Sequence, residues 1–327
     1  MNKTAKLYIA GHTGLFGNAL YEAAKKKGYK NVVVRKHDEL DLTRQEQVEV
    51  FFKSERPDYV IMAAALVGGI DANRRYMADF CMENLLMTCN VMNASHKYRV
   101  KKLLYLGSSC IYPRKCIQPI LEDSILTGSC EPTNEGYAIA KIAGIRLCEY
   151  YQKQYGDCFI SCIPANVYGP HDCFDLEKAH VIPALIMKFH EAKMKNAPEV
   201  TIWGTGRAER EFLFIDDAAE ACLKLFEYCN ESQPVNIGIG HTNTIQELSE
   251  IIRDTVGYTG EIKYDDAKPD GMPKRLLDSE KAKKYCIYPK TSLEEGIRHT
   301  YNWYLANIYE EQGNGHEKKK KNLYCRT

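Results

Sequence analysis

The strongest constraint on the fold is a regular alternation of short apolar segments and longer amphipathic segments between residues 5 and 165. The apolar segments have the length and composition of buried β-strands: "KLYIAG", "NVVVRK", "YVIMAAA", "KKLLYLG" and "CFISCIPA". The segments between them have the pattern of helices: "NALYEAAKKKG", "RQEQVEVFFKSER", "MADFCMENLLMTCNVMNASHKY" and about Tyr137 to Tyr155. Apolar strands that alternate with helices form parallel sheets covered on both faces. The sequence therefore predicts a Rossmann-type α/β fold with a doubly wound parallel sheet.

The pattern changes after Gly169-Pro170, where we expect a smaller C-terminal α/β region that binds the substrate. A loop and a helix are predicted in "HDCFDLEKAHVIPALIMKFHEAK", and short strands around a turn in "VTIWGTGRAEREFLFI". "PVNIGIG" indicates a further buried strand, and "TIQELSEIIRDTVG" an amphipathic helix. The predicted boundaries are 1–170 with a returning segment at about 212–241 for the nucleotide domain, 171–211 and 242–309 for the substrate region, and 310–327 for a basic flexible tail.

The charge balance gives no indication of a nucleic-acid or membrane partner. Lys and Arg number 44 and Asp and Glu number 43, a formal net charge of +1, so no global field favours a polyanion. No apolar run reaches the roughly 18 residues of a membrane span, and the N-terminus lacks the apolar core of a signal peptide. The 13 cysteines are scattered and form no C-x-x-C pair. We expect a cytoplasmic protein with reduced thiols and without a metal site.

A glycine-rich loop joins the first predicted strand to the first helix. "IAGHTGLFGNAL" places Gly11, Gly14 and Gly17 three residues apart. Glycine in such a loop permits a tight turn and a close approach of a pyrophosphate, which the N–H groups of the helix N-terminus then bind. The loop predicts a dinucleotide site.

The residues after the second strand indicate which dinucleotide is bound. An NAD site usually has an acidic residue there for the ribose 2′-hydroxyl, but this chain has Arg35 and Lys36. A guanidinium pairs with a 2′-phosphate. The sequence therefore favours NADP.

Small polar residues follow the fourth predicted strand, and a tyrosine and a lysine open the next helix. Ser108, Ser109 and Cys110 lie where "LLYLGSSCIYP" leaves the sheet, and "EGYAIAKIAG" places Tyr137 and Lys141 four residues apart on one helix face. A nearby ammonium lowers the pKa of a phenol, which makes it a better acid or base near neutral pH. We expect the lysine to act on the tyrosine in this way.

The order of glycine loop, strand-end serine, tyrosine and lysine resembles the extended short-chain dehydrogenase/reductases, from residue 5 to about residue 305. By this resemblance Ser108 binds the reacting oxygen, Tyr137 donates the proton, and Lys141 binds the cofactor ribose. Within that family the chain is similar to the GDP-L-fucose synthases in "YIAGHTGLFG", "AAALVGGI", "SSCIYP", "EPTNEGYAIAKIAGIRLCEYY", "NVYGPHDCFD", "HVIPALIMKFHEAK" and "REFLFIDD". Those enzymes invert C3 and C5 of GDP-4-keto-6-deoxymannose and reduce the C4 ketone with NADPH.

The second resemblance implies further site residues. Cys110 and His180 match the pair that moves protons at C3 and C5, since a thiol and an imidazole both titrate near neutrality. The implied cofactor-binding residues are Gly11, Gly14, Leu15, Phe16, Gly17, Arg35, Ala64, Lys141 and His180. The implied substrate-binding residues are Ser108, Ser109, Cys110, Asn166, Lys188, Trp203, Arg210, Lys268 and Asp270. The implied substrate is a GDP-linked 4-keto sugar of surface-polysaccharide synthesis. A homodimer through the helices at 76–98 and 137–155 is also implied.

Four residues differ from the usual pattern of these enzymes and leave the sugar open. Leu66 and Ala179 replace a common lysine and serine, Gly136 replaces the proline before the tyrosine, and Thr13 replaces an arginine that helps hold the 2′-phosphate. One alternative is a reductase without epimerase activity that acts on a GDP-4-keto-heptose already inverted by another enzyme. A non-catalytic NADP sensor and a UDP-sugar 4-epimerase that retains NAD are two more.

Overall fold

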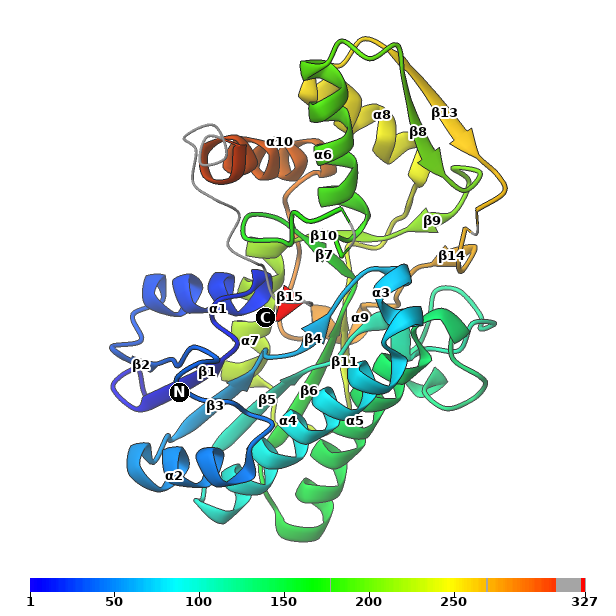
Figure 1. Ribbon diagram of the computed structural model, residues 1–327. Helices are drawn as coiled ribbons and strands as arrows, with labels where there is room; N and C mark the ends of the chain where they lie inside the picture. Colours follow the sequence, from blue (N-terminus) through cyan, green and yellow to red (C-terminus); the bar gives the residue numbers. More distant parts are fainter. Residues whose placement is uncertain (177, 269, 310–324, 327) are drawn as a thin grey trace.

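The computed structural model describes residues 1–309 except 177 and 269, together with 325 and 326. At its centre is a six-stranded sheet with the order β2-β1-β3-β5-β6-β11 (Figure 1). All neighbouring strands in it are parallel. The strands are β1 (Lys6–Ala10), β2 (Asn31–Val33), β3 (Tyr59–Met62), β5 (Lys102–Leu106), β6 (Phe159–Pro164) and β11 (Val235–Ile237). The prediction of a parallel α/β sheet is confirmed.

Helices cover both faces of this sheet. On one face α2 packs beside α4 and α4 beside α5, and on the other α1 packs beside α7 (Figure 1). Their bounds are α1 (Leu15–Lys26), α2 (Gln45–Glu55), α4 (Met77–Lys97), α5 (Glu135–Tyr155) and α7 (Ile215–Tyr228). The short helix α3 (Ile70–Arg75) precedes α4, and the 3-10 turns η1 (Ser109–Ile111), η2 (Glu122–Ser124) and η3 (Pro132–Asn134) lie between β5 and α5.

The core lies against the middle of the sheet. Every residue of β5 and of β6 is buried, which explains why both strands are continuous apolar runs rather than alternating ones. The chain runs from β1 outward to β2 and then returns to β3 on the other side of β1. Such a reversal leaves a crevice beyond the carboxyl ends of β1 and β3, where open α/β sheets bind ligands.

The C-terminal region consists of short strands in small sheets. The strand β7 (Asn166–Tyr168) pairs with β10 (Phe212–Phe214), and β8 (Glu199–Trp203) pairs with β13 (Glu261–Asp265). A third sheet has the order β12-β9-β14, formed by β12 (Asn243–Thr244), β9 (Glu209–Arg210) and β14 (Lys274–Arg275). The predicted short strands in 200–215 are present as β8, β9 and β10, and each of them pairs with a strand distant in sequence.

Helices pack on these small sheets and complete the upper part of the molecule in Figure 1. They are α6 (Val181–Met194), α8 (Ile245–Val256) and α10 (Leu293–Tyr304), which ends in a π-helical turn over Leu305–Tyr309. The predicted amphipathic helix at 244–257 is confirmed as α8, which begins with a capping box between Thr244 and Glu247. The remaining elements are α9 (Glu280–Lys283) and the backbone pair of β4 (Leu66–Val67) with β15 (Cys325–Arg326).

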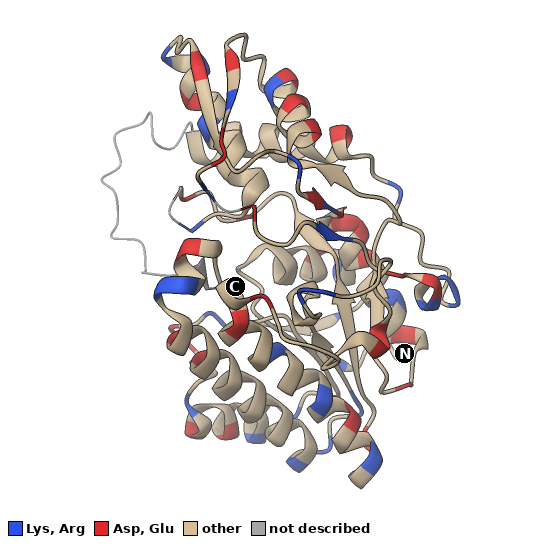
Figure 2. Ribbon diagram, turned by 90° about the vertical axis from the view of Figure 1, so that its right-hand side faces the viewer, with Lys and Arg blue, Asp and Glu red and all other residues tan. Residues whose placement is uncertain are grey.

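The distribution of charge in the structure agrees with the balanced composition of the sequence. Lys and Arg are interspersed with Asp and Glu over the ribbon (Figure 2). Among the described residues, no helix combines the length and the apolarity that crossing a bilayer requires.

Free thiols include Cys110, Cys162 and Cys222, whereas Cys173 is disulfide-bonded, in contrast to the expected reduced state. Most of the predicted basic tail, including Lys318 to Lys321, lies outside the described residues.

Candidate active site

The glycine loop forms a close-packed turn at the crevice. Gly11 has a φ of +85°, and a Cβ atom on it would lie 2.6 Å from the backbone of Ala64 at the end of β3. A Cβ atom on Gly17 would lie 2.0 Å from the carbonyl oxygen of Gly11. Gly14 is the N-cap of α1 and provides no side-chain acceptor, so N–H groups of the first turn, at Leu15 and Phe16, remain for an anion. This arrangement fits the pyrophosphate of a dinucleotide.

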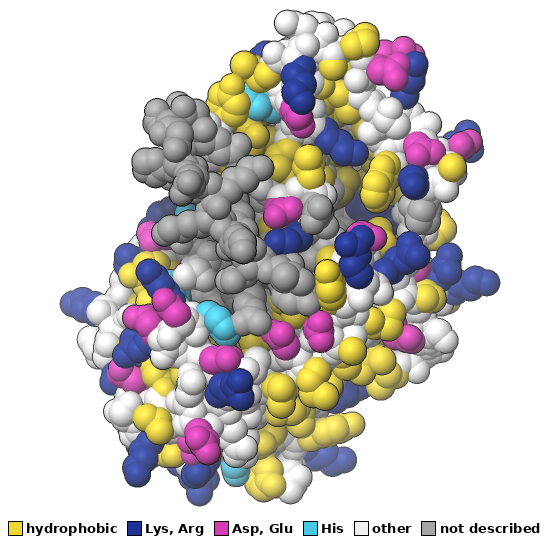
Figure 3. Space-filling view, viewed as in Figure 1, with side chains coloured by type: hydrophobic (Ala, Val, Ile, Leu, Met, Phe, Trp, Pro, Cys, Tyr) yellow, Lys and Arg dark blue, Asp and Glu magenta, His cyan; other side chains and the backbone are white. Residues whose placement is uncertain are grey.

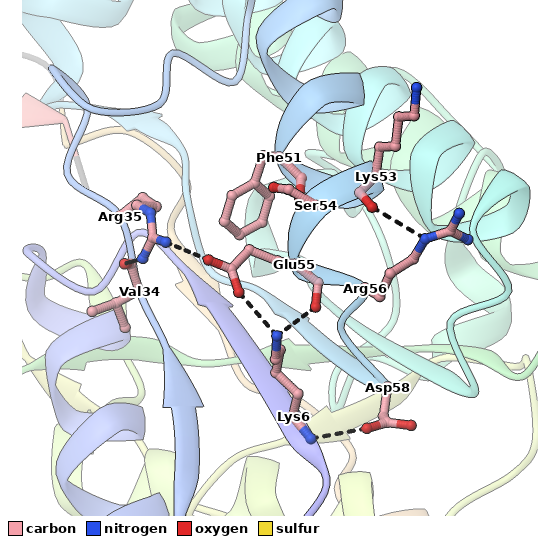
Figure 4. Close-up of polar contacts among 9 residues, drawn as sticks. All are labelled: Lys6, Val34, Arg35, Phe51, Lys53, Ser54, Glu55, Arg56 and Asp58. Carbon is pink, nitrogen blue, oxygen red and sulfur yellow. Dashed lines mark hydrogen bonds and ion pairs between the residues drawn. The ribbon is translucent and has the colours of Figure 1, made fainter.

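Arg35 follows β2, as predicted, but its guanidinium is already paired. Its Nη2 lies 2.5 Å from Oε1 of Glu55 at the end of α2, and Nη1 donates to the Val34 carbonyl (Figure 4). Lys6 shares the Glu55 carboxylate, and both cations hold the pKa of Glu55 below its usual value. A 2′-phosphate therefore competes with Glu55 for Arg35. Lys36, the next residue, and Thr13 in the glycine loop are both exposed.

Ser108, Cys110, Tyr137 and Lys141 come together beyond the carboxyl end of β5. Ser108 is the N-cap of η1, and its Oγ accepts from the Cys110 backbone N–H at 3.5 Å. The Lys141 Nζ donates to the Leu106 carbonyl at 2.8 Å and lies 5.7 Å from the centre of the Tyr137 ring. Ser109, which lies between Ser108 and Cys110 in the sequence, is buried. The predicted serine, tyrosine and lysine thus form one cluster.

The electrostatics of this cluster differ from the expectation in one respect. Burial raises the pKa of Tyr137 well above its ordinary value, and the charges of Cys110 and Tyr105 raise it further, while Ser108 opposes them. The expected lowering by Lys141 does not appear, because burial dominates and lowers the pKa of Lys141 itself to about 8. Tyr137 is consequently a protonated phenol at neutral pH, as a proton donor must be.

Cys110 is buried at the base of the same cluster. Burial raises the pKa of its thiol, whereas Ser108, Arg275 and Lys141 lower it in that order. The cysteine is therefore neutral at rest but lies among groups that favour the thiolate.

His180 is the exposed N-cap of α6. The Asp172 carboxylate faces it, and burial raises the pKa of this carboxyl while the charge of His180 lowers it. Ala179 lies against Gly69, whose N–H donates to the Lys178 carbonyl at 2.8 Å. This bond links the histidine loop to the segment after β4.

Trp203 and two lysines form a second cluster at the end of β8. Its indole is 62% exposed, and the ammonium groups of Lys188 and Lys268 lie 5.7 and 5.4 Å from the ring centre. An exposed aromatic ring beside cations suits a flat base attached to phosphates. The structure thus groups three of the predicted substrate-binding residues.

The other predicted substrate-binding residues have internal partners. Thr205 donates to both carboxylate oxygens of Asp270, so Asp270 holds the turn after β8 instead of presenting a free carboxylate. Arg210 donates to the Asp270 carbonyl at 3.2 Å, and the Asn166 amide donates to the Glu211 carbonyl at 3.1 Å. Of Asp270, Arg210 and Asn166, only Arg210 is a cation and so suited to bind a diphosphate.

Two of the unusual residues have structural explanations. Leu66 is fully buried in a small apolar cluster with Ala72 and Phe80, against which the partly buried Tyr137 also packs, so leucine fits the apolar surroundings of this position. A Cβ atom on Gly136 would lie 2.5 Å from the Met77 carbonyl oxygen. Glycine here permits close contact between the starts of α4 and α5.

Sequence reasoning missed Arg275 and Asp172: the charge of Arg275 lowers the pKa of Cys110, and the charge of His180 lowers the pKa of Asp172. Arg275 is in "GMPKRLLD" and Asp172 in "GPHDCF", polar segments where a charged residue is unremarkable. Two leucines directly after Arg275 were the available indication of burial. Among the described residues, no group of three or more metal-ligating side chains lies together.

Comparison with known proteins places the chain in a family. Residues 7–238 match the model of the NAD dependent epimerase/dehydratase family. The chain is 51% identical to GDP-L-fucose synthase 1 of Arabidopsis thaliana over 94% of its length and 95% of that protein's.

Two solved structures extend this comparison. MlghC, a GDP-mannoheptose C4 reductase of Campylobacter jejuni with NADP bound, is 35% identical with a TM-score of 0.85, covering 93% of this chain and 99% of that one. A GDP-L-fucose synthetase of Naegleria fowleri bound to NADP is 28% identical with a TM-score of 0.87, covering 95% and 96%. The chain therefore belongs to the NAD dependent epimerase/dehydratase family, and within it the resemblance to the GDP-L-fucose synthases is confirmed.

Proposed function

We propose that this protein reduces the C4 ketone of a GDP-4-keto-sugar with NADPH and also inverts C3 and C5, as GDP-L-fucose synthases do. The observation that carries the proposal is the cluster of Ser108, Cys110, Tyr137 and Lys141 beside a dinucleotide loop. A reductase alone needs three of these groups. The buried thiol is an additional acid-base group, which reduction does not require.

Reduction follows from the protonation states in the cluster. A ketone oxygen between Ser108 and Tyr137 accepts hydrogen bonds from both hydroxyl groups, which stabilise the negative charge that develops on it. NADPH supplies the hydride to C4 when it is bound. Tyr137, whose raised pKa keeps it protonated, then transfers its proton to the oxygen. Lys141, with a pKa of about 8, provides a positive charge beside the phenolate that remains.

Inversion uses the same oxygen-binding groups. Removal of a proton from C3 or C5 leaves an enolate, and Ser108 and Tyr137 stabilise its oxygen as they do in reduction. Cys110 and His180 exchange protons with the carbon from different sides of the site, one as thiolate base and the other as imidazolium acid. No electrons are transferred in this step, since one C–H bond breaks and another forms.

The Cys110→Ser variant separates the two activities. A serine hydroxyl is nearly isosteric with the thiol but far too weakly acidic to exchange protons at neutral pH. In D₂O, mass spectrometry of GDP-4-keto-6-deoxymannose is expected to show deuterium at C3 and C5 with the wild type and loss of that exchange with the variant. NADPH oxidation with a pre-inverted ketone is expected to stay within about threefold of wild type. Equal exchange by both proteins contradicts the role of Cys110, and no exchange by the wild type indicates a reductase only.

A GDP-4-keto-heptose is the second candidate substrate. It is favoured by the similarity to MlghC, which is named a GDP-mannoheptose C4 reductase. The substrates are distinguished by kcat/KM for NADPH oxidation with the 6-deoxyhexose and the heptose side by side. A preference of more than about tenfold for the heptose, some 1.4 kcal/mol, would replace the first candidate.

The protein is further proposed to be a cytoplasmic homodimer. Apolar side chains gather over α4 and α5 (Figure 3), where Met82, Leu86, Ile139 and Tyr150 are between 40% and 59% exposed. Two long helices that pack side by side in the same direction and carry such a face are suited to burial against a second copy. Sedimentation of the wild type and of the Leu86→Asp variant tests this proposal. The wild type is expected to sediment as a dimer and the variant as a monomer. If both sediment alike, the proposed dimer face is wrong.

A further inference from the structure

One short segment touches elements of both halves of the proposed site. This bridge segment spans residues 66–75, from β4 through α3. Figure 1 shows α3 on the side of the sheet half that faces the C-terminal region. The segment carries none of the predicted catalytic or binding residues, so its close contacts with the elements around it need a different explanation.

On one side the bridge segment packs against the elements that carry Tyr137. Leu66 and Ala72 form a buried cluster with Phe80, and the side chain of Tyr137 packs against this cluster. The helix α3 also lies beside η3, the turn that leads directly into α5. Because Leu66 and Phe80 are fully buried, this side of the segment belongs to the close-packed core.

On the other side the bridge segment meets the loop that precedes His180. The N–H of Gly69 donates to the Lys178 carbonyl at 2.8 Å, and a Cβ atom on Gly69 would lie 2.9 Å from the carbonyl oxygen of Ala179. Gly69 has a φ of −67° and a ψ of 179°, which any residue can adopt. The neighbouring loop, and not the backbone conformation, therefore requires the absence of a side chain at residue 69.

The side chain of Asn73 fixes the turn that makes this contact. It is only 6% exposed, and its Nδ2 donates to the carbonyls of Gly68 at 2.7 Å and Gly69 at 3.1 Å. Its buried Oδ1 has no hydrogen-bond partner among the described residues. Because an unpaired buried oxygen costs free energy, the turn that the amide fixes explains its presence better than a gain in stability does.

We infer that Gly69 positions His180 for proton exchange at C3 and C5, because it docks the loop before the histidine on a segment that also packs against Tyr137. The inference rests on the proposed epimerase function. Gly69 is a positioning residue, since it acts through the backbone of Lys178 and Ala179 and need not touch the sugar. Such positioning matters because a misplacement of about 1 Å can lower a rate about a hundredfold.

The Gly69→Ala variant tests this inference. The added methyl group meets the Ala179 carbonyl, and the loop is expected to move because it is partly exposed while the other side of the bridge segment is buried. The rate of deuterium incorporation from D₂O into GDP-4-keto-6-deoxymannose, followed by mass spectrometry, is expected to fall between about tenfold and about a hundredfold. NADPH oxidation with a pre-inverted ketone is expected to stay within about threefold of wild type, because Ser108, Tyr137 and Lys141 are unchanged.

A second measurement needs no substrate. Amide hydrogen exchange, followed by mass spectrometry of peptides, reports whether the histidine loop is docked. In the Gly69→Ala variant, exchange over residues 178–184 is expected to be about tenfold faster than in the wild type, since local opening no longer has to break the docking contact. Peptides from the middle of α5 are expected to exchange as in the wild type.

Asp71→Ala is the matched control, because Asp71 is in the same helix but is exposed and pairs with Arg75 at 2.8 Å. It is expected to change neither measurement. NADPH binding, followed by fluorescence, verifies that each variant is folded, and Asn73→Ala replaces Gly69→Ala if that variant does not bind.

Three results would overturn the inference. They are unchanged amide exchange in a folded variant, faster amide exchange with undiminished deuterium incorporation, and equal losses of deuterium incorporation and of reduction. If amide exchange is faster but the wild type itself incorporates no deuterium, the docking contact stands and the epimerase proposal fails.

Discussion

The two halves of the molecule hold their functional groups in different ways. In the half built on the six-stranded sheet, the reducing groups follow fully buried strands and the start of a long helix, and Lys141 is itself buried. In the C-terminal half, His180 is an exposed N-cap and Trp203 is 62% exposed at the end of a two-stranded sheet. Rigid supports suit groups that must meet a small reacting centre, while exposed groups suit a large ligand that covers them on binding.

This contrast suggests that the two halves serve different steps, one the reaction and the other the recognition of the substrate. The proposed chemistry at C4 uses groups fixed by the core, so their geometry exists before the substrate arrives. The proposed recognition of the GDP moiety uses short strands and exposed side chains, so substrate choice can change without disturbing the core. The similarity of one chain to both a fucose synthase and a heptose reductase agrees with such a division.

The largest effect is expected at Tyr137. Tyr137→Phe removes the proton donor and keeps the ring, so kcat for NADPH oxidation is expected to fall about a thousandfold with little change in KM. Trp203→Ala, in the other half, is expected to raise KM for the GDP-sugar by about tenfold and to leave kcat nearly unchanged. Steady-state kinetics with one substrate checks both. If the two variants lose the same parameter, the proposed division between the halves is wrong.

Stability is expected to follow the same contrast. Leu104 in β5 is fully buried between two neighbouring strands, and Leu104→Ala is expected to cost about 2–5 kcal/mol of unfolding free energy. Ile262 in β13 is only partly buried in a two-stranded sheet, and Ile262→Ala is expected to cost about 1 kcal/mol. Urea unfolding, with the midpoint and slope determined for each variant, measures the two values. Equal costs would mean that the small sheet is as tightly packed as the central one.

The difference between the halves also explains what the sequence predicts well. The strands of the main sheet are continuous apolar runs between helices, and a parallel βαβ order follows from that pattern alone. The β9 strand has two residues and is paired on both sides by strands more than 30 residues away in sequence, Asn243–Thr244 and Lys274–Arg275. No local pattern specifies such a pairing.

The candidate site divides in the same manner. Tyr137 and Lys141 are four residues apart on one helix, so their proximity follows from helix geometry. Arg275 lies beside Arg210 only because β14 aligns with β9, and Asp270 is occupied only because a threonine from another loop meets it. Contacts between charged residues that depend on the pairing of distant strands cannot be predicted from the spacing of residues in the sequence. The direction of the Tyr137 pKa shift is mispredicted for a similar reason. The motif indicates a lowered pKa, but burial raises it, and the spacing of a tyrosine and a lysine gives no information about burial.

The smallest effect is expected where the first half meets its cofactor. Glu55 holds the Arg35 guanidinium at 2.5 Å and adds a negative charge near the place proposed for the 2′-phosphate (Figure 4). Glu55→Gln removes that charge and releases Arg35, so KM for NADPH is expected to fall by about threefold while KM for NADH stays the same, because partly exposed ion pairs contribute little. Glu49→Gln is the control, since Glu49 is in the same helix but pairs with Lys97 and Tyr98. A rise in KM for NADPH would show instead that Glu55 orients Arg35 for the phosphate. Cofactor binding would then depend on an ion pair that is formed before NADPH binds, just as the proposed reduction depends on a cluster that is formed before the substrate binds.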